Sequence, residues 1–141
     1  MSCNLLQFWY MNECERFGEF VKATRLKNGI TARDAAQSAG MLPSNFSKLE
    51  HGAFAPARDT ARQRRLAAAI GLIAESPEEA EFFDHAAKAA RAVPVDIADI
   101  ISRDDAVPLL LRTIGNKRLA KTDIERLIEI VRGTPNVSKK P

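Results

Sequence analysis

The stretch from Ile30 to Gly52, ITARDAAQSAGMLPSNFSKLEHG, constrains the fold more than any other part of the chain. Alanines within residues 31–39 give a helix a small, close-packing inner face, and the hydroxyl of Thr31 can cap its start. Gly40 ends this helix, because glycine enters the left-handed conformation without steric penalty. Pro43 begins a second helix, since its fixed φ and missing N–H suit a first helical position. Two short helices joined by a tight turn predict a helix-turn-helix motif.

The second helix of this motif has two different faces. Phe46 and Leu49 are three residues apart, which places both on the side that faces the protein interior. The opposite side carries short polar and basic side chains, namely Ser44, Asn45, Ser47 and Lys48. The sequence therefore predicts a helix that is anchored on one side and presents a polar surface on the other.

The motif resembles the helix-turn-helix of the Cro/CI (Xre) family of bacterial and phage regulators. The agreement has no gap and covers Ile30, Thr31, Ala36, Gly40, Phe46, Ser47, Leu49, Glu50 and Gly52. Two departures stand out: Ala32 replaces a glutamine that often bonds a DNA phosphate, and Leu42-Pro43 replaces a common Ser-Arg pair. The resemblance implies an all-α fold that begins with a lambda-repressor-like, five-helix type of domain.

The resemblance also implies which side chains meet DNA. An α-helix fits the major groove of DNA. Base reading would fall to Pro43, Ser44, Asn45, Ser47 and Lys48, of which Lys48 suits the acceptors of guanine. Phosphate contacts would fall to Thr31, His51, Arg58 and Arg62. The alternative is that the arginines only decorate a solvated helix face and that His51 faces solvent.

Family members pair an arginine of the first helix with the glutamate of the motif. By this resemblance Arg25 and Glu50 form a partly buried ion pair that fixes the geometry of the two helices rather than adding much stability. The alternative is two unrelated surface charges. The first helix itself is expected over residues 13–28, with an inward stripe of Phe17, Phe20, Val21, Thr24 and Leu26.

Charge is distributed unevenly along the 141 residues. Residues 1–74 carry 10 Lys+Arg against 6 Asp+Glu, residues 75–105 carry 3 against 9, and residues 106–141 carry 8 against 3. A basic first part followed by an acidic segment suits a domain that binds an anion. We expect an N-terminal extension over 1–12, the DNA-binding domain over 13–74, a helical extension over 75–133 and a disordered tail over 134–141.

The N-terminal extension, MSCNLLQFWYMN, is apolar and aromatic without a clear period. Either Met11 is the true start of the protein, or Phe8, Trp9 and Tyr10 pack against a neighbouring segment or a second subunit. Both interpretations remain open on the sequence alone.

The helical extension begins at a capping box, Ser76-Pro-Glu-Glu79, and continues through further short helices. Its last two helices are expected to form an αα-hairpin with apolar stripes. We expect a homodimer through this hairpin, with the contact residues Leu110, Ile114, Ile124, Leu127, Ile128 and Val131. The alternative is that these side chains complete a monomeric core.

Several other classes of function are not favoured. The acidic residues of the second half lie at helix starts, where capping explains them, so no enzyme is expected. Cys3, Cys14 and the two histidines lack a metal spacing, so no metal or cofactor is expected. No apolar run approaches the roughly 20 residues that cross a bilayer, so we expect a cytoplasmic protein. The family resemblance implies a bacterial or phage origin and association with the nucleoid when bound.

The expected function is that of a dimeric, sequence-specific repressor of transcription that binds an inverted repeat in double-stranded DNA. The second interpretation is an antitoxin-like module that masks a partner protein, with DNA binding secondary. The region VPVDIADIISRDDAVPLLLRTIGNKRLAKTDIERLIEIV is loosely similar to the tails of Xre regulators found beside ImmA/IrrE-type peptidases or in toxin–antitoxin pairs. That similarity implies a toxin or a peptidase as the partner.

Overall fold

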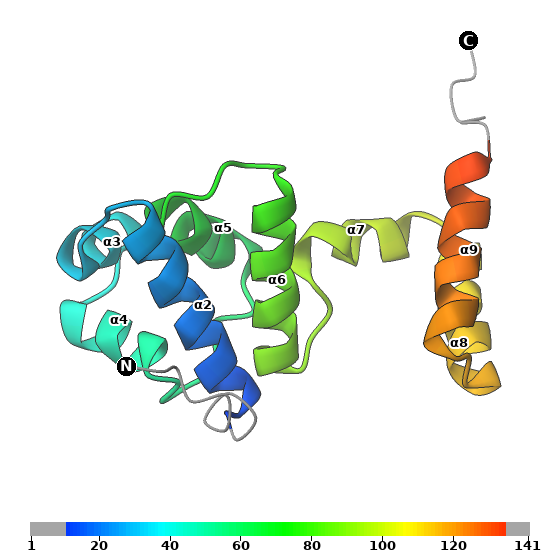
Figure 1. The fold of residues 1–141 in the computed structure, drawn as a ribbon, viewed down its shortest axis with the longest axis horizontal. Helices are drawn as coiled ribbons and strands as arrows, with labels where there is room; N and C mark the ends of the chain where they lie inside the picture. The colour runs from blue at the N-terminus through cyan, green and yellow to red at the C-terminus, as the bar shows by residue number, and fades with distance from the viewer. Residues whose placement is uncertain (1–10, 135–141) are drawn as a thin grey trace, which may run out of the picture. The chain divides into compact units, whose positions relative to one another are not determined.

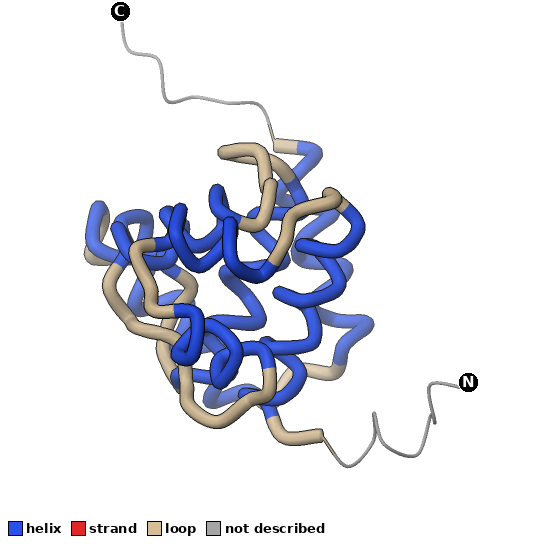
Figure 2. Tube along the Cα trace, turned by 90° about the vertical axis from the view of Figure 1, so that its left-hand side faces the viewer, coloured by secondary structure: helices blue, strands red, loops and turns tan. Residues whose placement is uncertain are grey.

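The computed structural model describes residues 11–134 (Figure 1). The aromatic N-terminal extension and the tail beyond residue 134 therefore lie outside the described residues. Every regular element between residues 11 and 134 is a helix, as the tube of Figure 2 shows, so the expected all-α fold is confirmed there. The helices are α2 (Glu13–Lys27), α3 (Ala32–Ala39), α4 (Pro43–Glu50), α5 (Thr60–Ala69), α6 (Pro77–Ala90), α7 (Val95–Arg103), α8 (Ala106–Lys117) and α9 (Lys121–Gly133).

The ends of the first helices follow the local sequence signals. The side chain of Asn12 accepts a hydrogen bond from the N–H of Glu15 at 2.9 Å and so caps α2. Thr31 Oγ1 accepts from the N–H of Asp34 at 3.1 Å and caps α3. Gly40 ends α3 at a φ of 69°, in the left-handed region that favours glycine. Each of these caps satisfies a backbone group that would otherwise lack a partner.

The described residues form two compact units that divide after Asp99, so the boundary falls within α7. In the first unit α2 packs against α4 and α6, while α3 packs against α4 and α5. Its core contains the fully buried side chains of Phe17, Phe46, Phe82 and Phe83, together with Val21, Leu49 and Ile70. The rings of Phe17 and Phe82 lie 5.3 Å apart, within the range of favourable aromatic pairs.

This core extends the first unit beyond the boundary expected from the sequence. The expectation ended the domain at residue 74 and assigned α6 to a separate extension. In the structure Phe82 and Phe83 of α6 belong to the same apolar core as α2 and α4. The packing has a simple physical reason: α6 supplies Phe82, the ring partner of Phe17.

The inward face of α2 also differs from the expected stripe at one position. Phe17, Val21 and Arg25 are buried at a spacing of four residues, but Leu26 is 59% exposed. The buried face continues through Arg25 because Glu50 provides its charge with a partner. Arg25, paired with Glu50, thus occupies the buried position that the sequence pattern predicted for Leu26.

The second unit contains α8 and α9, which are joined by residues 118–120. No side chain of α8 or α9 is buried. A pair of helices with apolar side chains and no buried residue does not form a core of its own. Among the described residues, no helix is long and apolar enough to span a membrane.

Candidate nucleic-acid interface

The turn between α3 and α4 is short because backbone hydrogen bonds close it tightly. The N–H of Gly40 donates to the carbonyl of Gln37, and the N–H of Met41 donates to the carbonyl of Ala36. Ala35 and Ala36 are fully buried, so their small side chains allow α3 to approach its neighbours closely. This turn sets the direction in which α4 leaves the motif.

Helix α4 presents the two faces that the sequence predicts. Phe46, Leu49 and Glu50 are buried and attach the helix to the first unit. The five expected base-reading residues, Pro43, Ser44, Asn45, Ser47 and Lys48, are all exposed. The structure therefore places the polar side chains together on a helix surface that is free to meet a partner.

The ion pair implied by the resemblance is present between α2 and α4. Arg25 Nε donates to Glu50 Oε2 at 2.8 Å, and Arg25 Nη2 donates to Glu50 Oε1 at 3.2 Å. Arg25 is 7% exposed and Glu50 is 9% exposed. Arg25 Nη1 also donates to the carbonyl of Ile30 at 3.0 Å, at the residue that leads into α3. One guanidinium thus ties α2 to α4 and to the segment before α3.

Gly18, which no sequence pattern singled out, determines how closely α2 approaches α4. A Cβ at this position would collide with the backbone carbonyl oxygens of Leu49 and Glu50. A glycine in the middle of a helix normally costs stability relative to alanine, so its presence in an apolar stripe was the available signal. Here the missing side chain lets the end of α4 rest on the backbone of α2.

The start of α4 has no side-chain cap. Leu42 occupies the cap position and makes no side-chain hydrogen bond to the helix, and its side chain is 66% exposed. The first N–H groups of a helix carry partial positive charge and favour anions. The exposed start of α4 therefore offers backbone donors as well as polar side chains.

The expected phosphate ligands differ in whether their side chains already have partners within the protein. Thr31 is exposed, and its oxygen already caps α3 while its O–H can still donate. The Arg62 side chain is 79% exposed, and its nearest carboxylate, that of Asp59, is 4.0 Å away. An ion pair that is so long and so exposed contributes little, so Arg62 remains free to bind an anion.

Two other expected phosphate ligands have partners within the protein. Arg58 Nη2 donates to the carbonyl of Ala90 at 2.7 Å, at the end of α6, where a cation suits the helix dipole. His51 Nδ1 donates to the carbonyl of Ser47 at 2.7 Å. The Nε2 atom of His51 can therefore donate to a phosphate only when the ring carries a second proton. The structure gives Arg58 and His51 roles in the fold that the sequence did not reveal.

The expected dimer contacts lie in the second unit. Leu110, Ile124, Leu127, Ile128 and Val131 are exposed, and Ile114 is partly buried. They are joined by other exposed apolar side chains of the same helices, Leu109, Leu111 and Ile130. Within residues 11–134, no group of three or more His, Cys, Asp or Glu residues is placed to hold a metal ion.

No protein-family model and no curated protein matches this chain. In structure, the chain is similar to the crystal structure of the clp gene regulator ClgR from C. glutamicum. The TM-score is 0.42 and the sequence identity 22%, over 55% of this chain and 91% of that chain. A similarity of this size assigns no function, so function has to follow from the side chains of this chain.

Proposed function

We propose that this chain is a sequence-specific, double-stranded DNA-binding regulator of transcription, with α4 as the helix that enters the major groove. The observation that carries the proposal is the exposed polar face of α4, which is held in place by a buried opposite face and by the Arg25–Glu50 pair. A rigid helix of this width fits the major groove, and its first residues reach base edges. Acting on DNA, the protein would work in the cytoplasm at the nucleoid.

The side chains divide into two roles. Lys48, Ser44, Asn45 and Ser47 would contact base edges, with Pro43 against a thymine methyl group. Arg62 and Thr31 would contact phosphates, which position the protein without reading sequence. Because serines discriminate weakly, part of the specificity would come from the shape of the DNA.

We further propose that the protein acts as a dimer and represses its own gene from an inverted repeat. A single reading domain buries only about 600–1,000 Å² on DNA. A twofold dimer doubles the contact and places two α4 helices on half-sites about one helical turn apart. The exposed apolar side chains of α8 and α9 supply a surface that a second copy can cover.

The test is a footprint of the full chain on its own upstream region, with random DNA of equal length as the control, at two salt concentrations. The proposal expects two protected half-sites about one turn apart that persist at the higher salt. Equal binding to both DNAs that disappears as salt rises would contradict sequence-specific recognition.

A second candidate function rests on the same exposed apolar surface of α8 and α9. If a toxin or a peptidase covers this surface instead of a second copy, the chain is an antitoxin-like module whose DNA binding is secondary. A monomeric free chain that forms a stable complex of equal stoichiometry with the product of an adjacent gene would favour this function. A dimer in the absence of other proteins would favour the repressor.

A further inference from the structure

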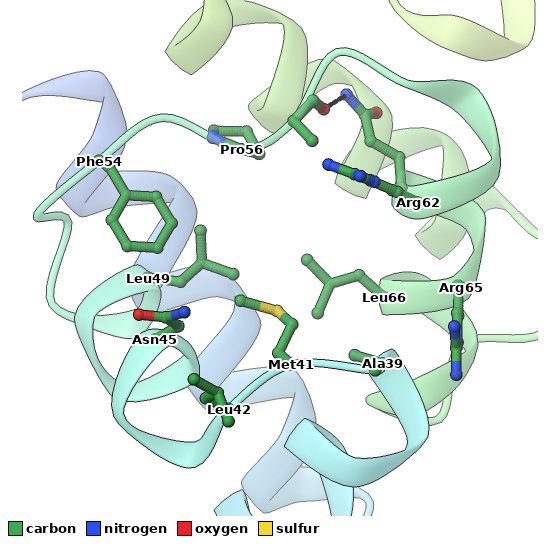
Figure 3. Close-up of a pocket in the computed structure, with 13 residues that line it drawn as sticks. Ala39, Met41, Leu42, Asn45, Leu49, Phe54, Pro56, Arg62, Arg65 and Leu66 are labelled. Carbon is green, nitrogen blue, oxygen red and sulfur yellow. Dashed lines mark hydrogen bonds between the residues drawn. The ribbon is translucent and has the colours of Figure 1, made fainter.

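A cavity of about 570 Å³ lies between α4, the loop of residues 51–59 and α5 (Figure 3). Cavities of about 300–1,000 Å³ with mostly apolar walls and a few polar groups are typical of small-molecule sites. The apolar part of the wall, a little more than half of it, is formed mainly by the side chains of Met41, Leu42, Leu49, Phe54, Pro56 and Leu66. The space therefore suits a ligand with an apolar body.

The charged side chains that line this cavity are both cationic, while Asn45 and Gln63 add neutral amides. Arg62 extends over the cavity from α5, and Arg65 lies at its edge (Figure 3). Arg65 Nε donates to the carbonyl of Ser38 at 3.0 Å, and its other guanidinium nitrogens have no partner among the described residues. None of the described lining residues is an Asp or a Glu. The Asp59 carboxylate lies 4.0 Å from Arg62 Nε, but both side chains are exposed and the pair is weak, so the two guanidinium groups still favour an anionic group on the ligand.

The lining of the cavity also includes a buried amide. Gln63 is 4% exposed, and its Nε2 donates to the carbonyl of Ala57 at 2.8 Å, which fastens the loop to α5. Its Oε1 is buried and has no hydrogen-bond partner among the described residues. Buried acceptors are normally paired, so this oxygen calls for a hydrogen-bond donor, which a bound water can supply and a carboxylate cannot.

From the cavity and its two guanidinium groups we propose that it is an effector site for a small organic carboxylate with an apolar body. The carboxylate would bind the guanidinium of Arg62, with Arg65 adding positive potential, and the apolar body would lie against Phe54, Leu49 and Leu66. Charge-assisted hydrogen bonds of this kind are about twice as strong as neutral ones.

The position of the cavity links it to DNA binding, and this link rests on the proposed function. Arg62 serves as a phosphate ligand there, so a bound carboxylate competes with DNA for the same guanidinium. The ligand would also lie beside Leu42 and Asn45, at the start of α4. A ligand that occupies these groups lowers the affinity for DNA, and DNA lowers the affinity for the ligand by the same factor.

The first experiment measures binding to the full chain without DNA, by amide NMR shifts and calorimetry. The probes are phenylacetate, hexanoate and benzoate, and the controls are the corresponding uncharged amides and inorganic phosphate. We expect at least one carboxylate to shift the amides of the residues that line the cavity. The proposal is wrong if none of the three carboxylates binds at millimolar concentration, if the amides bind equally well, or if phosphate alone reproduces the shifts.

Matched variants then locate the bound probe. Arg62→Gln and Phe54→Ala should each weaken binding of the carboxylate about tenfold or more, because one removes the charge partner and the other an apolar wall. Both side chains lie at the surface, so neither change threatens the fold. Arg33→Gln removes an exposed arginine that does not line the cavity and should leave binding unchanged. Equal affinity in all four proteins would overturn the assignment of the site.

The last experiment adds DNA. Saturation with the bound probe should reduce affinity for the footprinted DNA by about fivefold or more, and Phe54→Ala should remove most of this effect at the same probe concentration. Bound probe without any loss of DNA affinity would overturn the regulatory role. If the chain bound no specific DNA at all, the proposed function would fail, while the binding experiments without DNA would still decide whether the cavity is a site.

Discussion

Gly18 shows how a single missing side chain fixes the distance between two helices. Gly18→Ala would place a Cβ against the carbonyl oxygens of Leu49 and Glu50, and backbone atoms cannot move aside cheaply. We expect the free energy of unfolding to fall by about 1–3 kcal/mol, as in other overpacked interiors. Urea denaturation followed by circular dichroism measures the change.

The matched control is Gly115→Ala, because a Cβ at this other helical glycine meets open space. It should leave the unfolding of the first unit unchanged. Equal stability of Gly18→Ala and the natural chain would show that α2 and α4 are not held at the distance the structure gives.

Lys48 and Arg62 should separate the reading of bases from the binding of phosphates. Lys48→Ala should weaken binding to the operator by about 1–3 kcal/mol and relax specificity at one base pair. Arg62→Ala should weaken binding to all sequences alike and reduce the dependence on salt. Titrations of operator and random DNA over a range of salt concentrations measure both effects. Equal losses on both DNAs from both variants would contradict this division of roles.

At the scale of the elements, the start of α4 is the one place in the motif where a local stabilising group is missing. Leu42 occupies the cap position without a side-chain hydrogen bond. Leu42→Ser supplies a hydroxyl acceptor for the first N–H groups and should raise the free energy of unfolding by about 1 kcal/mol. Thermal unfolding measures the gain, and Leu42→Ala is the control that shortens the side chain without supplying an acceptor. A serine variant no more stable than the alanine variant would show that the start of α4 is not limited by capping.

The positions of these helices could be predicted because their ends depend on neighbouring residues. Thr31, Gly40, Pro43 and Ser76 each act within a few residues of the helix end that they determine. The polar face of α4 was predictable for the same reason, since the spacing of Phe46 and Leu49 fixes it.

The features that the sequence did not predict depend on contacts between distant residues. α6 belongs to the first core because Phe82 meets Phe17, and Arg58 is engaged because the end of α6 lies within reach of its side chain. The cavity likewise forms where α4, a loop and α5 meet, and no local pattern marks it. Periodicity and capping describe single elements, whereas these features follow from the way elements pack.

At the scale of the whole molecule, the two units differ in how they use their apolar residues. The first unit buries a continuous core of aromatic and aliphatic side chains. In the second, the large apolar side chains of α8 and α9 remain exposed or only partly buried. Exposed apolar surface of this kind on a chain of 141 residues is typical of an interaction site.

The proposed dimer predicts a distinct outcome for a charge placed on the apolar face of α9. Ile124, Leu127, Ile128 and Val131 share one face of this helix by their spacing, whereas Thr122 lies on the opposite face. Ile128→Asp should convert the dimer to a monomer of 15.6 kDa in sedimentation experiments, because an unpaired carboxylate would be buried at the interface. Thr122→Asp introduces the same charge and should leave the dimer intact. The monomeric variant should still show the helical signal of a folded first unit, but it should lose the paired footprint and protect single half-sites weakly. A natural chain that sediments as a monomer while protecting both half-sites would rule out α8 and α9 as the dimer interface in solution.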